Sequence, residues 1–557
     1  MKKKLFTTLG IILSLAIIAS GVYFFLSRKD TYKLTTEEQK WVENNKNNVI
    51  DLYMPSDIPI FTESGAGVLF DLVTFISDNV GIKFNPIAYQ NETDATGQYN
   101  IILTNDILDN DIKISADEYV LLSKNEEIIT STYQLNNKKI GILDSELSNV
   151  KPYLGENLNY VSYSDKQSLI NALTNDEVNY IVVLKSLYTN EILTNKYHIN
   201  YHLSDLKKYY VLRINDDNKL LTSIIKKEIK RFNNVEYDKS YNSNLFNIYV
   251  KLNNISEQEL TDLNSKSYTY GYINNGIYDT TYHNSLSGTN YFIVKSFASF
   301  ANIDMKYESP FKNLNELNEA FISNKIDFYF NNTIFTNDEL SIQTYKPISS
   351  KIVFVSRNDK KITINSINAL KDYRVAVLEN STLEQVLVEK DISVQKYSNY
   401  KEMFKSKNLK NNEIIALELD NYEYYKTRSL GNYHISYIMD ESISYGFTSS
   451  KDYELFNKLF NFYLEYIDTN SIIDINYANV FEYEGLNIFL LILVVILSII
   501  VIISLLWLLL NIPNIFNISK KMLMLLELIS KSAVSFVSAV RPIKVLEDFN
   551  SVIGKQK

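Results

Sequence analysis

At 557 residues the chain exceeds what one hydrophobic core usually organises, so several domains are expected. Its 46% hydrophobic and 22% charged residues are typical of folded protein. The net charge of −9 excludes nucleic acid as the main partner, because binding the phosphate backbone needs a concentrated basic face. The absence of cysteine excludes disulfides, thiolate metal sites and a lipid-modified N-terminal cysteine.

An uncharged apolar run begins almost at the N-terminus. Residues 5–26 follow a basic segment, residues 1–4, which is predicted to be cytoplasmic. As a helix this run would be about 33 Å long, enough to cross the ~30 Å hydrocarbon core of a bilayer. Ala19-Ser20-Gly21 would suit signal-peptide cleavage, but the apolar run continues to Leu26, beyond the usual signal core. An uncleaved anchor is therefore predicted, with a cleaved signal peptide as the alternative.

A second apolar run, residues 488–510, is the clearest membrane signal in the chain. Lys520 and Lys521 follow it, whereas Glu484 precedes it. Because basic residues accumulate on the cytoplasmic side, both termini are predicted to be cytoplasmic and residues from about 27 to 486 to face outside.

The residues after the second run, 511–557, are too few for a kinase or cyclase domain. They combine apolar residues such as Met522–Leu526 with basic residues around them. This tail is predicted to lie on membrane lipid or to pack against a cytoplasmic signalling partner, with a plain juxtamembrane helix as the alternative.

Between the two runs, three stretches recur in the same order at an offset of about 235 residues. The paired stretches are Lys138–Leu143 with Tyr373–Leu378, Tyr163–Lys166 with Tyr397–Tyr400, and Tyr210–Arg213 with Tyr445–Thr448. Fixed spacing of this kind indicates two copies of one domain.

Each copy alternates short β-rich runs with amphipathic helical segments. Ile101–Leu103 and Ile352–Val355 are expected to be strands, and Leu314–Ile322 an amphipathic helix. This alternation predicts α/β domains with mainly parallel sheets. The predicted domains are residues 34–253 and 267–480, with a polar connector at 254–266.

The segments in these copies resemble those of a known family. Leu34–Val42 looks like a short entry helix before a strand at Val49–Met54, and Gly67–Leu72 resembles a Gly-x-x-x-Asp-Leu helix start that contains Asp71. Ala320–Phe328 resembles a helix followed by an Asp-containing strand. Both copies thus resemble family 3 solute-binding proteins, the type II periplasmic-binding-protein or Venus-flytrap fold, in the tandem form of bacterial sensor-kinase and diguanylate-cyclase ectodomains.

The resemblance implies two lobes per domain, joined by two crossing strands that close around a small polar ligand, on the outside of a bacterial cell membrane. The hinges are expected at Ile128–Tyr133 and Leu206–Arg213 in the first domain, and at Lys351–Arg357 and Met439–Phe447 in the second. Closure of this kind is a rigid-body change that an anchored helix can transmit.

In amino-acid-binding members, a first-lobe arginine that follows a threonine pairs with the ligand carboxylate. The corresponding turns here contain Thr104 in one copy and Thr336 with Asn337 in the other, without an arginine. These residues remain candidate ligand contacts, but binding of ordinary α-amino acids is not expected.

The resemblance also implies contacts from the second lobe. Ser381 and Thr382 open a helix whose free N–H groups suit an anionic group, and Ser145 is the weaker counterpart. Ser381 with Glu384 also fits a capping box that needs no ligand. A family aspartate that holds a ligand amine corresponds to Glu418 or Asp420 in the second copy, whereas the first copy has a lysine or an apolar residue.

The family candidates and the composition together indicate a receptor. No nucleophile elbow, phosphate-binding loop or metal-spaced cluster is present, so neither an enzyme nor a cofactor is predicted. His198 and His202 lie on a predicted strand, about 13 Å apart, too far to share a metal. The first copy is interpreted as a spacer or a homodimer contact.

Three functions remain open. The first is a membrane-anchored receptor that passes ligand-driven lobe closure to a separate cytoplasmic partner, or whose own output domain has been lost. The second is a membrane-tethered solute-binding subunit of a transporter. The third is an envelope interaction protein that does not bind a ligand.

Overall fold

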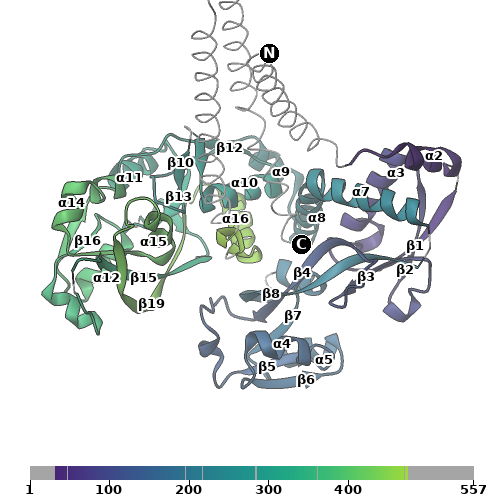
Figure 1. Ribbon diagram of the computed structural model, residues 1–557, viewed down its shortest axis with the longest axis horizontal. Coiled ribbons are helices and arrows are strands. Elements are labelled where there is room, and N and C mark those ends of the chain that lie inside the picture. Colours follow the sequence, from purple (N-terminus) through teal and green to yellow (C-terminus); the bar gives the residue numbers. More distant parts are fainter. Residues whose placement is uncertain are drawn as a thin grey trace, which may run out of the picture.

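The computed structural model describes residues 32–474, apart from residues 47, 195, 216–217, 283–284, 336, 361 and 470. Both predicted membrane spans, the predicted cytoplasmic N-terminus and the tail lie outside these residues. Within the described part of the chain, no helix is both long and apolar enough to cross a membrane. The described residues form two α/β modules, one in each half of the chain (Figure 1).

The first module is built on one mixed sheet, with the described strands in the order β2-β1-β3-β8-β4-β7-β5-β6. These strands are β1 (Val49–Pro55), β2 (Lys83–Tyr89), β3 (Tyr99–Thr104), β4 (Ile112–Ser123), β5 (Lys139–Leu143), β6 (Asn159–Tyr163), β7 (Tyr180–Leu184) and β8 (His198–Ile214). β4 and β8 pair antiparallel from one end of the module to the other. They are therefore the two crossing strands that join its lobes.

The helices of the first module are α2 (Thr36–Asn45), α3 (Val68–Val80), α4 (Leu147–Leu154), α5 (Lys166–Thr174), α6 (Thr189–Leu193), α7 (Lys219–Val235) and α8 (Tyr237–Leu252). Two of them, α2 and α3, show why the chain turns into a helix where it does. Thr35 and Glu38 form a reciprocal capping box at the start of α2. Gly67, before α3, has a φ of 123°, and a Cβ there would lie 2.5 Å from the carbonyl oxygen of Ile60, so only glycine fits.

The second module repeats this plan. Its described strands follow the order β12-β9-β13-β19-β15-β18-β16-β17, and β14 pairs with β19 beside this path. They are β9 (Ser267–Gly271), β12 (Asp304–Tyr307), β13 (Phe328–Asn331), β14 (Ser341–Gln343), β15 (Ile348–Arg357), β16 (Val375–Leu378), β17 (Val394–Tyr397), β18 (Ile414–Glu418) and β19 (Tyr433–Ser450). A small hairpin is formed by β10 (Thr280–Tyr282) and β11 (Ser285–Ser287). Here β15 and β19 are the crossing strands.

The second half of the chain has a corresponding set of helices. They are α10 (Thr289–Ala301), α11 (Leu314–Ile322), α12 (Thr382–Glu389), α13 (Tyr400–Met403), α14 (Ser406–Asn411), α15 (Leu419–Lys426) and α16 (Glu454–Tyr466). The predicted connector contains α9 (Glu257–Asn264), which has a capping box of Ser256 and Glu259 and buries Leu263 against the core. Gly288 precedes α10 with a φ of 113°, as Gly67 precedes α3.

The strand register confirms the internal repeat. Tyr210 pairs with Ser115 in the first module, and Tyr445 pairs with Ile348 in the second. Likewise, Tyr119 faces Leu184, and Ile352 faces Glu418. Residues on the crossing strands and at the ends of β7 and β18 therefore correspond between the modules.

The expected hinges are correct in three of four cases. Leu206–Arg213 lies in β8, while Lys351–Arg357 and Met439–Phe447 lie in β15 and β19. The expectation for Ile128–Tyr133 is wrong, because this segment is a loop and a short 3₁₀ turn. The crossing strand is β4, which ends at Ser123, before the segment expected to form the hinge.

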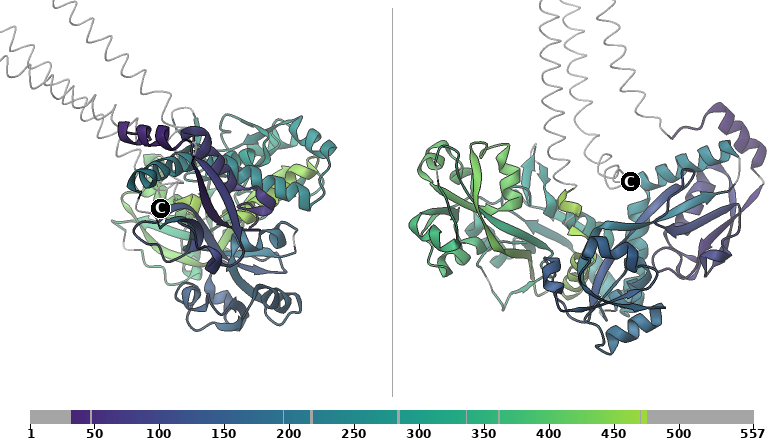
Figure 2. Two further views of the ribbon diagram at one scale, coloured as in Figure 1. Left: turned by 90° about the vertical axis from the view of Figure 1, so that its right-hand side faces the viewer. Right: turned by 60° about the horizontal axis from the view of Figure 1, so that its bottom comes forward.

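The two modules share one continuous apolar core through α8, α10 and α16 (Figures 1 and 2). The ring of Phe246 on α8 lies 5.6 Å from that of Phe300 on α10. The ring of Tyr249 on α8 lies 4.8 Å from that of Phe462 on α16. The last described long helix of the second module is thus packed against the first.

Candidate functional site

The lobes of the second module meet directly at buried polar side chains. The Tyr278 hydroxyl, in the loop after β9, donates a 3.0 Å hydrogen bond to Asp420, in the first turn of α15. The Asn421 side chain accepts a bond from the backbone N–H of Ile277 and donates one to the side-chain amide oxygen of Asn275, at 3.1 and 3.3 Å. Because α15 belongs to the second lobe and residues 275–278 to the first, these contacts bridge the lobes.

Glu418 lies at the centre of this polar region. It is buried and accepts hydrogen bonds from the hydroxyls of Tyr400 and Tyr445 and from the side-chain amide of Asn421, at 3.0, 2.9 and 2.9 Å. Burial raises the pKa of Asp420, although hydrogen bonds from Ser350 and Tyr278 oppose the shift. Two carboxyl groups surrounded by hydroxyl and amide donors form a site that suits a ligand rich in hydrogen-bond donors.

The start of α12, the anion site predicted for the second module, is covered by the opposite lobe. The N–H of Thr382 donates to the carbonyl oxygen of Asn332 at 3.0 Å, and the Thr382 hydroxyl donates to that of Thr333 at 3.2 Å. Ser381 forms a β-bridge with Thr333, and its side chain accepts the N–H of Glu384 at 3.1 Å. The backbone of the first lobe thus occupies the place predicted for an anionic ligand.

Several other candidates have structural contacts in the described part of the chain. Asn337 and Thr104 accept hydrogen bonds from backbone N–H groups two or three residues ahead, as turn residues do. Asp71 accepts bonds from Ser240 and Asn244 of α8 at 2.5 and 2.9 Å, so it braces α3 against α8. Ser145 is exposed, just before the N-cap of α4. Thr336 lies outside the described residues.

In the first module, the position that corresponds to Asp420 is Ser186. Its hydroxyl donates to Asp117 of β4 at 2.6 Å and contacts the Tyr210 hydroxyl at 2.9 Å. Burial raises the pKa of Asp117 to about 6, although the bond from Ser186 and the charge of Lys185 oppose the shift. In the second module the partners are exchanged, because Asp420 bonds to Ser350 of β15. Both modules therefore join the second lobe to a crossing strand by one serine–aspartate pair.

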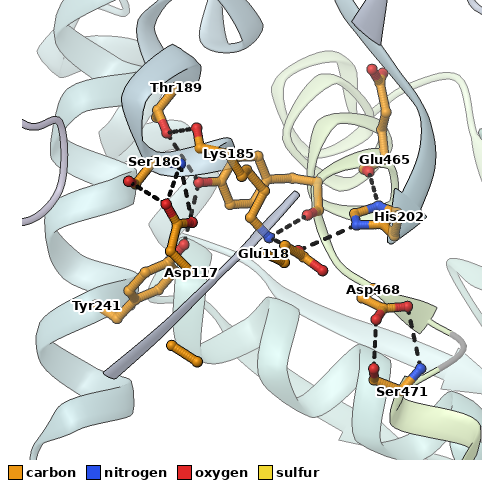
Figure 3. A network of polar contacts seen from close by, with 12 residues as sticks. Asp117, Glu118, Lys185, Ser186, Thr189, His202, Tyr241, Glu465, Asp468 and Ser471 are labelled. Carbon is orange, nitrogen blue, oxygen red and sulfur yellow. Dashed lines mark hydrogen bonds and ion pairs between the residues drawn. The ribbon is translucent and has the colours of Figure 1, made fainter. Parts of the chain in front are cut away.

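Aromatic rings cover this pair in the first module. Phe61 stacks on Tyr210 with ring centroids 4.2 Å apart, and Tyr241 of α8 meets Phe61 edge to face at 6.0 Å. The hydroxyls of Tyr241 and Tyr466, from α16 of the second module, lie 3.2 Å apart. The side chains around Asp117 thus come from both modules (Figure 3).

Sequence reasoning missed most of these contacts. Tyr210 and Tyr445 were recognisable as equivalent repeat positions, and this equivalence was the signal that could have identified them. Asp117 and Tyr278 carry no comparable signal, because each becomes meaningful only through a partner that is far away in the chain.

No protein-family model and no curated protein matches the chain. Solved structures do match. The periplasmic domain of BvgS from B. pertussis is 13% identical, covering 79% of this chain and 91% of that chain with a TM-score of 0.36. A structure described as VC protein is 14% identical, covering 76% and 99% with a TM-score of 0.47. ArgBP from T. maritima is 16% identical, covering 40% and 99% with a TM-score of 0.35.

These TM-scores stay below 0.5, so the fold assignment rests on the strand order of this chain. In the first module, one lobe has the order β2-β1-β3-β8-β4 and the other β6-β5-β7-β4-β8. In each lobe, the fourth strand in this order is antiparallel to the third and crosses over from the opposite lobe. The second module has the same arrangement. The described part of the chain is therefore a tandem pair of Venus-flytrap domains of the type II periplasmic-binding-protein fold.

Proposed function

We propose that the chain is a membrane-anchored extracytoplasmic receptor whose second module responds to a small polar ligand. The observation that carries this proposal is the buried contact between lobes at Tyr278, Asp420 and Asn421. A ligand that bonds to both lobes there would replace these contacts and change the angle between the lobes. Two predicted anchors would place this module beside the membrane.

The chemistry of the site favours a ligand with amine or hydroxyl donors. Glu418 and Asp420 present carboxyl oxygens, and the described hydrogen bonds around them come from tyrosine, serine and asparagine side chains. A carboxylate ligand would meet these two carboxyl groups without the arginine that usually pairs with it. Amines and polyols are therefore the proposed ligand class.

The output of the receptor is proposed to pass through the predicted helix at 488–510. Because the second module ends closest in sequence to this helix, a change in its lobe angle would move the chain that enters the membrane. A separate cytoplasmic protein would receive the signal.

A second candidate function follows from the directness of the lobe contacts. The β-bridge between Thr333 and Ser381 and the bond from Thr382 join the two lobes of the second module directly. A module whose lobes bind each other in this way would suit an envelope interaction protein. Ligand screening separates the two candidates.

The test is a thermal-shift screen of the full-length chain with amines, polyols, amino acids and sugars. A ligand at 100 times its Kd should stabilise the module by ~2.7 kcal/mol, a shift of several degrees. Asp420→Asn should weaken binding of an amine at least tenfold, because a neutral amide cannot pair with the cation. Asp391→Asn is the matched control, since Asp391 is an exposed carboxylate of the same module.

The outcomes decide between the candidates. A ligand whose shift is lost in Asp420→Asn and kept in Asp391→Asn supports the receptor. No shift with any compound of the panel would favour the envelope interaction protein. A ligand-induced thermal shift that is unchanged in Asp420→Asn would show that the ligand binds at another site.

A further inference from the structure

The carboxyl end of α16, from the second module, ends against two basic side chains of the first (Figure 3). Lys185 Nζ, just after β7, donates to the carbonyl oxygen of Tyr466 at 3.3 Å. His202 Nε2, on β8, lies 3.3 Å from the carbonyl oxygen of Glu465. Carbonyls in the last turn of a helix lack intrahelical partners and carry partial negative charge. The first module therefore supplies a cationic cap for a helix of the second.

The geometry around His202 requires a protonated ring. Its Nδ1 lies 3.2 Å from a carboxylate oxygen of Glu118, while its Nε2 faces the carbonyl oxygen of Glu465. Both neighbours are acceptors, and a neutral imidazole can donate from only one nitrogen. Only the imidazolium form satisfies both contacts.

The surrounding charges favour this form. Glu118 on β4 also pairs with Lys185, and the side chains of both are about one-tenth exposed. Burial alone would raise the pKa of Glu118, but the charges of Lys185 and His202 hold it below its usual range. Burial alone would lower the pKa of His202, but Glu118 and, more weakly, Asp468 raise it despite the opposing charge of Lys185.

Further contacts hold the end of α16 in this place. The Glu465 carboxylate accepts the N–H of Ile199 at 2.8 Å and lies 3.2 Å from His198 Nδ1, which is also near Glu126. The Tyr466 ring lies 4.6 Å from Lys185 Nζ, and its hydroxyl lies 3.3 Å from that of Thr189. These contacts to the end of α16 come from the crossing strand β8 and from the second lobe of the first module.

We propose that the first module binds the end of α16, a helix of the second module, and that protonation of His202 strengthens this binding. The proposal goes beyond ligand binding by the second module and does not depend on it. The pKa of His202 is raised above its ordinary 6.5. The stabilisation is therefore complete below about pH 6.5 and is lost as pH rises through the raised value. An acidic exterior would strengthen the contact between the modules at the end of α16, and an alkaline one would weaken it.

Hydrogen exchange of the full-length chain between pH 5.5 and 8.5, corrected for intrinsic exchange rates, tests the proposal. Protection of peptides from α16 should fall about tenfold or more as pH rises, because a charge-assisted hydrogen bond is lost. His202→Gln should show lower protection than the wild type and a clearly smaller change with pH, and the change that remains comes from His198 beside Glu465. His434→Gln is the control, since His434 is exposed on β19 and bonds to Asn358, and it should behave as wild type.

A variant with a permanent cation at position 202 gives a second test by hydrogen exchange. His202→Lys should keep α16 protected at both ends of the pH range. If His202→Gln does not fold, the wild-type and His202→Lys profiles decide the question. Protection that is flat with pH in the wild type, or a wild-type slope that persists in His202→Gln, would overturn the proposal. Asp117, whose pKa burial raises to about 6, is retained in His202→Gln, so its titration contributes to both profiles.

Discussion

At the scale of single residues, the second module contains a carboxyl group in an unusually apolar position. Asp279 is buried beside Tyr270 and Asn290, which donate hydrogen bonds of 3.0 and 2.7 Å to one of its oxygens. Its other oxygen has no hydrogen-bond partner within the described structure. Burial outweighs the two hydrogen bonds and raises the pKa of Asp279 to about 7.

This group makes stability depend on pH. The unfolded chain loses the proton near pH 3.8, whereas the folded protein keeps it to about pH 7, so stability should fall between these values and stay level above them. Asp279→Asn should remove this fall and raise stability at pH 8 by on the order of 4 kcal/mol. Urea unfolding of the wild type and the variant at pH 5 and pH 8 measures this change in the free energy of unfolding. Equal pH dependence in the variant and the wild type would contradict the assignment.

At the scale of elements, the start of α12 shows how one sequence pattern fits two roles. The Ser381 side chain accepts the N–H of Glu384 and donates to the carbonyl oxygen of Leu378 at 2.7 Å. Lys396 pairs with the Glu384 carboxylate at 2.6 Å. These contacts are those of a helix cap, and the opposite lobe accepts the N–H of Thr382.

We therefore expect Ser381→Ala to cost about 1 kcal/mol of stability, the usual loss of an N-cap. Ser381→Gly should cost only a few tenths of a kcal/mol, because glycine is tolerated at this position. Chemical denaturation of both variants gives the comparison. A ligand found by screening should bind both variants with wild-type affinity, and a large loss of affinity would show that Ser381 contacts it.

The misplaced hinge has a physical reason at the same scale. β4 contains Asp117, Glu118 and Lys113, and a strand with three charged residues does not look buried in sequence. In the structure, Asp117 and Glu118 are satisfied by Ser186, Lys185 and His202, so their burial is tolerated. The partners lie at least 67 residues away and could not be paired from the pattern alone.

At the scale of the whole molecule, the modules share a core rather than a flexible link. Phe462 of α16 is 5% exposed and packs against Tyr249 of α8. Because aromatic residues from both modules fill this interface, we expect the two modules to unfold together.

Phe462→Ala should lower the stability by ~3–5 kcal/mol and divide one calorimetric transition into two, because it removes a ring that joins the modules. Phe354→Ala is the matched control, since Phe354 is fully buried in the second lobe of the second module. The control should lower the midpoint and keep one transition. Two transitions already present in the wild type would contradict the shared core.

Two copies of one domain, their order and several of their strands follow from the amino-acid sequence alone. These features depend on local periodicity and on a repeat at fixed spacing, which the chain carries without folding. The predicted anchors are also local features, and they lie outside the described residues. The structure agrees with the predictions of the entry helix, the first strand and the crossing strands β8, β15 and β19.

Which polar groups meet depends on the tertiary structure. His202 and Glu465 are 263 residues apart, and Tyr278 and Asp420 are 142 apart. The energy of a buried charge or hydroxyl depends on its partner and its exclusion from water, and both arise when distant segments converge. For this reason the repeat could be predicted, whereas the closed lobe contact and the cationic cap on α16 could not.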